Sequence, residues 1–533
     1  MADMERAGKD SGFVYITTIV YFALTLFNIL HHEMWRDELH AWMIAVYSNS
    51  VTELFQVIRY EGHPSLWFII LYIVKHLTTT PVAMQIVHLL IATFSAFIFL
   101  RFAPFKNLLK ALFIFGYFPF FEYANISRNY SIGILLLFIF CVFFRKDLKN
   151  RNYITLAVIL FLMCQCNVFS TILAISLGIT IFFEPLLFRD FSVYKSGRFF
   201  TAIFIFMAGL VLSVIIMVPP ADSFSHPSAN FTDNIAQRVS DQISQVWNVF
   251  LPIPRIQKAF WQTNFLSYLP LQREVRYALR LVVSLGLLLF PLCIILRKKT
   301  PAFYYIISIV GITAFGYLLH GGSLRHKGHF YFVFVSALWI SDYYRTNEFI
   351  KPSLNSFFNF FERNRNYFIT AIFSFGLIGA LIANTLDYLY PFSASKETAN
   401  YIKQHSLQNM PIASLWAFPS SGVSAYLDRA FYNAEHDRMQ TFTLLKPTTK
   451  RKEDVHSSEF DSVGSPVWFS GITNVVTYRN NAKADVLLIV NNIRVPDELI
   501  KHYGLIALKE FTNSIVKEER YFLYIMPYAG TSP

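Results

Sequence analysis

The residues best suited to chemistry cluster in one short stretch, His31-His32-Glu33-Met34-Trp35-Arg36-Asp37-Glu38-Leu39-His40-Ala41-Trp42. The adjacent carboxylates Asp37 and Glu38 could deprotonate a hydroxyl or amine acceptor, which is general base catalysis. Tryptophan is typical of the membrane–water interface, so Trp35 and Trp42 suggest that depth. The same composition is also typical of an interfacial belt with solvated charges. The stretch therefore allows two interpretations, an acid–base site at a membrane surface or a structural belt.

A further carboxylate and imidazole follow in Glu61-Gly62-His63-Pro64. Proline is common in the first turn of a helix, so the structural interpretation is a helix entry at Pro64. The functional interpretation is a second wall of the same site, where Glu61 and His63 could bind a metal. Two ligands do not define a metal site. We therefore predict no required cofactor and leave a divalent metal open.

Two more polar clusters interrupt apolar sequence. Glu122-Tyr123-Ala124-Asn125-Ile126-Ser127-Arg128-Asn129-Tyr130 is either a turn between helices or a site, because polar residues at membrane depth are costly and commonly functional. Its Arg128 could bind phosphate with a planar fork of donors. His320-Gly321-Gly322-Ser323-Leu324-Arg325-His326-Lys327-Gly328-His329 is either a solvated turn or a site for an anion such as a lipid phosphate.

The elements that must position these clusters are long apolar segments. Of 533 residues, 54% are hydrophobic and only 15% are charged, whereas soluble proteins have about 25% charged residues. Since a membrane-spanning helix needs about 20 apolar residues, we predict a mainly α-helical, polytopic transmembrane bundle. Apolar segments occur at residues 12–30, 64–77, 82–100, 108–124, 127–144, 152–168, 169–188, 199–219, 276–296, 301–319, 328–343 and 366–389.

Lys and Arg gather in short clusters after Leu100, Phe144, Phe188, Leu296 and Tyr344. Basic loops face the cytoplasm, so these clusters orient the chain. They also account for the net charge of +12 without a nucleic-acid surface.

This orientation places the loops 31–63 and 220–275 outside, together with the two polar clusters before Tyr130 and His329. The loop 31–63 is expected to carry helices that lie in the interface. An inside start and an outside end require an odd number of crossings. The twelve apolar segments do not fit this, so we predict eleven to thirteen spans. Either the segment 64–77 is re-entrant and does not cross, or a further span lies near 346–362.

The sequence changes character after residue 390, where Lys, Asp, Glu, Asn and Ser become frequent. Ala484–Val490 and Tyr521–Met526 have the pattern of strands, and Lys396–His405 has the pattern of a helix. We predict two domains, a transmembrane domain at 1–390 and a small soluble α/β domain at 391–533.

In their order, the polar clusters resemble the GT-C superfamily of membrane glycosyltransferases. The likeness is to the dolichyl-phosphate-mannose-type protein mannosyltransferases and to the aminoarabinose transferases that modify lipid A. The matching elements are Asp37-Glu38, Glu61-Gly62-His63-Pro64, Arg128-Asn129-Tyr130 and Arg325-His326-Lys327-Gly328-His329-Phe330. The resemblance covers about 390 residues. It departs where this chain has Arg-His-Lys in place of a late Arg-Tyr element, and the C-terminal domain carries no recognisable sugar- or peptide-binding motif.

This resemblance implies a polyprenyl-phosphate-linked sugar as donor and a lipid, glycan or protein as acceptor. Asp37 would be the general base, with inversion at the anomeric carbon, and Glu38 a supporting carboxylate. It also implies a bacterial inner membrane, with the active site and the C-terminal domain periplasmic. The donor phosphate would be bound by Arg128, Arg325, His326 and Lys327, which offset charge on the leaving lipid phosphate. The acceptor and sugar pocket would comprise Trp35, Arg36, His40, Glu61, His63 and Tyr130.

Two other functions fit a chain of this class. A multispan transporter or lipid flippase of the cell envelope would place polar residues along a path through the membrane, often in inverted repeats. The sequence shows no clear repeat, and its polar clusters lie at span ends, which favours interfacial chemistry. A non-catalytic scaffold for envelope polysaccharide would instead depend on the external domain.

Overall fold

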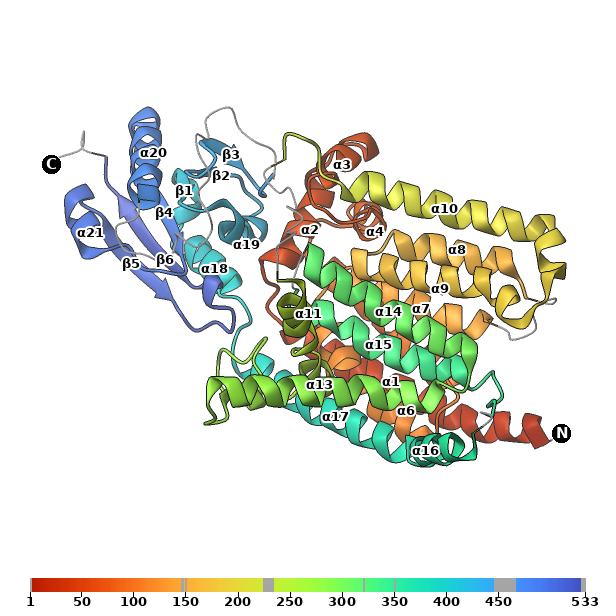
Figure 1. Ribbon diagram of the computed structural model, residues 1–533. Helices are drawn as coiled ribbons and strands as arrows, with labels where there is room; N and C mark the ends of the chain where they lie inside the picture. The colour runs from red at the N-terminus through yellow and green to blue at the C-terminus, as the bar shows by residue number, and fades with distance from the viewer. Residues whose placement is uncertain are drawn as a thin grey trace.

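The computed structural model describes residues 2–144, 148, 151–223, 234–319, 322–348, 351–444 and 466–528. Helices fill most of the chain, and a small sheet lies near its C-terminal end (Figure 1). The predicted architecture, a helical bundle followed by an α/β domain, is confirmed. His320 and Gly321 of the predicted basic turn lie outside the described residues.

The bundle consists of α1 (Ala2–His31), α2 (Arg36–Tyr47), α3 (Val51–Ile58), α4 (Leu66–Val74), α5 (Val82–Phe102), α6 (Asn107–Ile114), the π-helical turn η1 (Phe118–Glu122), α7 (Tyr130–Phe143), α8 (Tyr153–Cys164), α9 (Val168–Phe188), η2 (Phe191–Lys195), α10 (Gly197–Met217), α11 (Ile235–Ile243), α12 (Trp247–Phe250), η3 (Phe265–Tyr268), α13 (Arg273–Ile295), α14 (Lys299–Leu318), α15 (Leu324–Ser341), α16 (Pro352–Arg363) and α17 (Arg365–Leu389).

Every predicted apolar segment coincides with helical structure, but the helices differ in length. Among the described residues, the segments long and apolar enough to cross a membrane are Ser11–His31, Val82–Phe102, Val168–Phe188, Gly197–Met217, Arg273–Ile295, Lys299–Leu318 and Pro352–Leu389. These seven are fewer than the eleven to thirteen predicted, because α4, α6, α7 and α8 have only 9, 8, 14 and 12 residues and α15, with 18 residues, is not among the seven. The segment 64–77 is thus a short helix, and the suspected span near 346–362 is the amphipathic α16.

The loop 31–63 forms the helices α2 and α3, as predicted, and most of α2 is buried within the protein. Nine of its twelve residues are buried. The reason is that α4 packs on one side of α2, and the C-terminal domain packs on another. Burial on several sides holds the residues of α2 in fixed positions.

Aromatic side chains fill the centre of the bundle. The ring of Phe99 on α5 lies 4.0 Å from the ring of Phe113, 5.2 Å from that of Phe138 and 5.8 Å from that of Trp339. Each large aromatic residue buries much apolar area, and tilted pairs add to that stabilisation. This cluster packs α5, α6, α7 and α15 together.

The C-terminal domain contains one six-stranded sheet in the order β3-β2-β1-β4-β6-β5, with β1 parallel to β2 and β4. The other pairs are antiparallel. The predicted strands and helix of this domain are present. Its elements are α18 (Ser395–Gln404), η4 (Leu407–Asn409), β1 (Ile412–Ser414), α19 (Ala417–Leu427), β2 (Phe431–Asn433), β3 (Arg438–Gln440), α20 (Pro466–Ala482), β4 (Val486–Asn491), α21 (Asp497–Tyr503), β5 (Ile506–Phe511), η6 (Lys517–Glu519) and β6 (Tyr521–Met526).

Helices cover both faces of this sheet, so the domain has two apolar layers. Ile402 of α18 and Val423 of α19 pack on one face, and Ile472 of α20 and Leu499 of α21 pack on the other. The face with α18 and α19 is turned toward the bundle, where α19 contacts α2 (Figure 1). The C-terminal domain therefore lies directly against the helix that carries Asp37.

Candidate active site

A cavity of about 820 Å³ opens at the end of the bundle that faces the C-terminal domain. It joins segments from across the chain. Its polar lining includes Asp37, His40, Glu61, His63, Arg128, Asn129, Tyr130, Asn167, Arg325 and His326. Its apolar lining includes Trp67, Phe68, Phe169, Val214, Met217, Val218, Pro219, Phe315, Leu319 and Phe418.

Asp37 is surrounded by arginines. Its Oδ2 lies 3.0 Å from Arg325 Nη2 and 3.9 Å from Arg128 Nη2, and its Oδ1 lies 4.0 Å from Arg36 Nε. Burial alone would raise the pKa of this carboxyl group, but the three guanidinium groups outweigh burial and lower it. Asp37 is therefore a carboxylate in the unliganded site.

Glu38 has a different position, although it is the next residue. It is fully buried and does not line the cavity. Its Oε2 accepts a hydrogen bond from Trp35 N at 3.1 Å and lies 3.1 Å from His32 Nε2, while Oε1 accepts from Ser127 N at 2.6 Å. Adjacent residues of an α-helix point about 100° apart, and here this separation turns Asp37 to the cavity and Glu38 to the core. Glu38 joins the start of α2 to the loop before α7.

His32 completes this buried network. Its Nδ1 lies 2.8 Å from Asp387 Oδ2 on α17, opposite its contact with Glu38. Burial lowers the pKa of His32, but Asp387 and Glu38 together raise it well above its usual value. A protonated His32 donates to both carboxylates, which fixes the end of α1 against α2 and α17.

Arg128 and Arg325 are held by further groups in addition to the Asp37 carboxylate. Arg128 Nη1 donates to the backbone oxygen of Asp37. The guanidinium of Arg325 lies 5.1 Å from the ring centroid of Trp35 and 5.8 Å from that of Trp261. Within the described part of the chain, Arg325 Nε, Arg325 Nη1 and Arg128 Nε are buried without an acceptor. Buried donors without acceptors are rare, so these three nitrogens indicate a place for an anion.

Imidazoles and a carboxylate form the opposite wall. His40 Nε2 lies 2.9 Å from Glu61 Oε2. Burial and, after it, the charge of Arg128 lower the pKa of His63 to about 4, so this side chain is neutral at pH 7. His40 Nδ1, Glu61 Oε1 and His63 Nδ1 have no hydrogen-bond partner among the described residues. This wall therefore offers polar atoms to a hydroxylated ligand.

The remaining predicted residues divide into two groups. His326 and Tyr130 line the cavity and bond to each other, with His326 Nε2 2.8 Å from Tyr130 Oη. Lys327 does not line it, because its ammonium group donates to Gln245 Oε1. Trp35 and Arg36 lie behind the cavity wall, where they contact Arg325 and Asp37.

Sequence reasoning missed the apolar side of the cavity and its contact with the C-terminal domain. Val214 and Met217 lie in the last turn of α10, Val218 follows it, and Phe315 lies near the end of α14. Apolar residues carry no signal in a chain that is apolar almost throughout. Phe418, at the start of α19, reaches the cavity from a domain for which the sequence offered no site motif.

Comparison with known proteins places this geometry in a known fold. No protein-family model matches the chain, and no curated protein matches it in sequence. The crystal structure of ArnT from Cupriavidus metallidurans bound to undecaprenyl phosphate matches with a TM-score of 0.51 at 11% sequence identity, over 98% of this chain and 99% of that one. The chain has the ArnT fold.

The apo ArnT structure from the same organism matches with a TM-score of 0.49 at 13% identity, over 98% of this chain and 99% of that one. The similarity to bound ArnT runs through both the bundle and the C-terminal domain, since nearly all of each chain is covered. The likeness to the GT-C fold that the polar clusters predicted is thereby confirmed at the level of the fold.

Proposed function

We propose that the chain is a membrane glycosyltransferase that moves a sugar from a polyprenyl-phosphate-linked donor to an acceptor. The observation that carries this proposal is the position of Asp37, a carboxylate between two arginines at the head of a cavity with one apolar side. The ArnT fold supports it, because the ArnT structure has undecaprenyl phosphate bound. We place the site on the periplasmic face of a bacterial inner membrane.

The cavity suits the two parts of such a donor. Arg325 and Arg128 present the unpaired nitrogens that would hold a phosphate. The prenyl chain would leave along the apolar side formed by Val214, Met217 and Phe315. His326 lies on the phosphate side, whereas Lys327 does not line the cavity and its ammonium group pairs with Gln245.

The reaction then needs one base and no added acid. The acceptor oxygen or nitrogen attacks the anomeric carbon on the face opposite the phosphate, and Asp37 takes the acceptor proton. The bond between the anomeric carbon and the phosphate oxygen breaks, and both electrons leave with the lipid phosphate. Configuration at the anomeric carbon inverts. Arg325 and Arg128 stabilise the charge that develops on the departing phosphate.

The low pKa of Asp37 in the unliganded site is compatible with this role. Arg325 and Arg128 lower that pKa while they pair with the carboxylate. A bound phosphate shares both cations, so the pKa of Asp37 rises when the donor is in place. The base thus becomes stronger only in the complex that reacts.

The polar wall would bind the sugar or the acceptor. His40, Glu61, His63 and Tyr130 face the same space as Asp37. Within the described residues, His40 Nδ1, Glu61 Oε1 and His63 Nδ1 have no hydrogen-bond partner and can pair with hydroxyl groups, while Tyr130 Oη pairs with His326. Among the described residues no group of three or more His, Cys, Asp or Glu side chains could hold a metal ion. The expectation of no required cofactor, with a divalent metal left open, stays a prediction.

The proposal is tested with the purified chain in proteoliposomes that contain undecaprenyl-phosphate-linked sugars with a labelled sugar. Membrane extract supplies lipid, glycan and protein acceptors. We expect label to leave the lipid and undecaprenyl phosphate to accumulate. A donor that stays intact while it crosses the bilayer would instead establish a lipid flippase. A donor that neither reacts nor crosses the bilayer would contradict both transfer and transport, and would favour a non-catalytic scaffold.

A further inference from the structure

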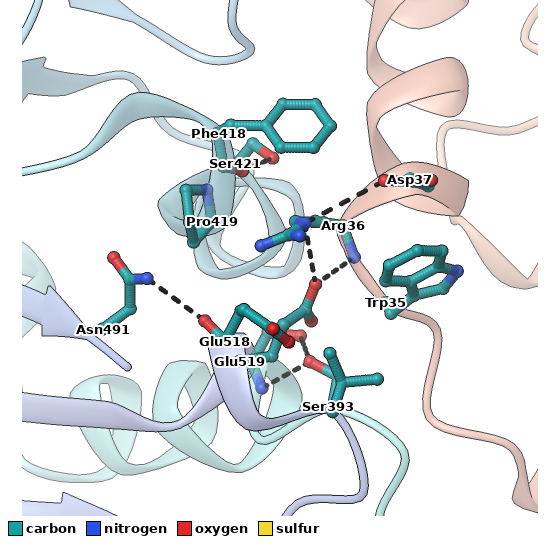
Figure 2. Close-up of polar contacts among 12 residues, drawn as sticks. Trp35, Arg36, Asp37, Ser393, Phe418, Pro419, Ser421, Asn491, Glu518 and Glu519 are labelled. Atoms are coloured by element: carbon teal, nitrogen blue, oxygen red, sulfur yellow. Dashed lines mark hydrogen bonds and ion pairs between the residues drawn. The ribbon is translucent and has the colours of Figure 1, made fainter. Parts of the chain in front are cut away.

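The helix that carries Asp37 is capped by a residue of the other domain. Glu519 ends the turn η6 in the C-terminal domain and is fully buried. Its Oε1 accepts a hydrogen bond from the backbone nitrogen of Arg36 at 2.7 Å, and Arg36 is the first residue of α2 (Figure 2). The first backbone N–H groups of a helix have no partner within the helix and carry partial positive charge. A carboxylate at this point stabilises the start of α2.

The side chain of Arg36 continues the contact to the reacting carboxylate. Arg36 Nε lies 3.9 Å from Glu519 Oε1 and 4.0 Å from Asp37 Oδ1. Its guanidinium lies 5.1 Å from the ring centroid of Phe418, which lines the cavity. Figure 2 shows Arg36 between Asp37 on one side and Glu519 on the other. One arginine thus links the two carboxylates across the domain boundary.

Glu519 is itself held in place from the membrane side. The backbone nitrogens of Ile515 and Val516 donate to Pro391 O at 2.9 Å and Phe392 O at 3.1 Å, in the linker after α17. The backbone nitrogen of Ala394, in the same linker, donates to Glu519 O at 3.2 Å. The segment that precedes Glu519 is therefore fixed to the end of a membrane helix.

The sheet holds the same turn from the other side. Asn491 Nδ2, at the end of β4, donates to Glu518 O at 3.1 Å. Because the linker and the sheet both hold this turn, the position of the Glu519 carboxylate does not depend on α2 alone. Glu519 can therefore fix the position of the first turn of α2.

We propose that Glu519 is a positioning residue, which orients Asp37 through the first turn of α2 and the side chain of Arg36. The C-terminal domain then completes the active site. This inference rests on the proposed glycosyl transfer, but its structural half can be measured without any activity.

The charge of Glu519 gives the proposal a further readout. Burial raises the pKa of this carboxyl group to about 7, although Arg36 opposes the shift. The ionisable groups around it are Arg36 and Asp37 on α2, Tyr426 on α19 and Tyr521 on β6. An ionised Glu519 caps α2 more strongly than a neutral one. We therefore expect kcat to rise with pH around neutrality as Glu519 ionises.

The test compares Glu519→Ala and Glu519→Gln with a matched control, Glu518→Ala, whose side chain is exposed. All are made in the full chain. Amide hydrogen exchange of residues 36–38, kcat, KM and the Kd for undecaprenyl phosphate are measured. In Glu519→Ala we expect amide exchange of residues 36–38 to become about five- to tenfold faster and kcat to fall about five- to tenfold, the usual effect of a lost helix cap. KM and the Kd for undecaprenyl phosphate should stay within about twofold of the wild-type values.

Glu519→Gln keeps an oxygen acceptor for Arg36 N. We expect amide exchange of residues 36–38 in Glu519→Gln to be slower than in Glu519→Ala. We also expect kcat of Glu519→Gln not to rise with pH near pH 7, as it should in the wild type. Unchanged exchange in Glu519→Ala, or equally fast exchange in both variants, would overturn the proposal. If the wild-type chain neither transfers sugar nor binds undecaprenyl phosphate, the proposed function fails, whereas the exchange measurement still decides the positioning role.

Discussion

Arg325 Nη2 lies 3.0 Å from Asp37 Oδ2, although 288 residues separate them in the chain. Arg325 is the second residue of α15, and Asp37 lies in the first turn of α2. The two side chains meet because α2 is buried beneath the C-terminal domain and α15 begins beside it. This ion pair defines the head of the cavity and leads to the first prediction.

Asp37→Asn should separate catalysis from lipid binding. The amide cannot take a proton, so we expect kcat to fall by at least about 10²-fold, the lower range for general base catalysis. Arg325 and Arg128 lose their anionic partner, so undecaprenyl phosphate should bind as tightly as before or more tightly. Transfer assays and equilibrium binding measure the two effects. Asp497→Asn, on the exposed start of α21, is the matched control. Weaker lipid binding in Asp37→Asn would contradict this assignment of the arginines.

Arg325→Lys should weaken binding of the lipid phosphate although the charge is kept. Lysine lacks the planar fork, and it stacks less well between Trp35 and Trp261. Hydrogen bonds to charged groups contribute about 1.5–3 kcal/mol, so we expect the Kd for undecaprenyl phosphate to rise at least about tenfold. Arg494→Lys, in an exposed pair with Glu510, should leave the Kd unchanged. An unaltered Kd in Arg325→Lys would place the phosphate elsewhere.

Arg128→Gln should move the acid limb of kcat/KM to higher pH. Burial raises the pKa of Asp37, and Arg128 is the largest of the influences that lower it. Removing that cation raises the pKa, so the carboxylate is protonated and inactive at higher pH than in the wild type. A pH profile of kcat/KM measures the shift. Arg59→Gln, an exposed change at the end of α3, should leave the profile in place. A downward shift would be inconsistent with Asp37 as the base.

Gly328→Ala should displace Arg325 without touching the cavity. A Cβ at Gly328 would lie 2.7 Å from Phe118 Cε1 and 2.8 Å from Tyr123 Oη. Overpacking of this kind costs about 1–3 kcal/mol, and α15 must move away from the aromatic wall. Because Arg325 lies one turn earlier on α15, we expect transfer to fall about tenfold and the melting temperature to drop.

The control for this variant is Gly286→Ala on α13, where a Cβ would meet no heavy atom within 4 Å. Replacing glycine by alanine within a helix usually stabilises it, by about 0.5–1 kcal/mol. We expect unchanged transfer and an equal or higher melting temperature. Equal losses in the two variants would show that any added methyl group harms the bundle.

Much of the fold could be predicted because it depends on local patterns. Long apolar runs form helices in a membrane, since every backbone polar group must be satisfied within its own segment. The strand-like apolar run Tyr521–Met526 corresponds to β6 with the same bounds. Span number was harder to predict, because α4, α6, α7 and α8 are apolar yet short.

The sequence by itself determined which polar residues stand at helix ends, and so which of them could form a site. Only the tertiary structure decided which of them face the same space. Helical geometry turns Asp37 toward the cavity and Glu38 into the core, and it turns His326 toward Tyr130 and Lys327 toward Gln245. Glu519 and Phe418 reach the site through the packing of a separate domain, which depends on contacts between residues hundreds of positions apart.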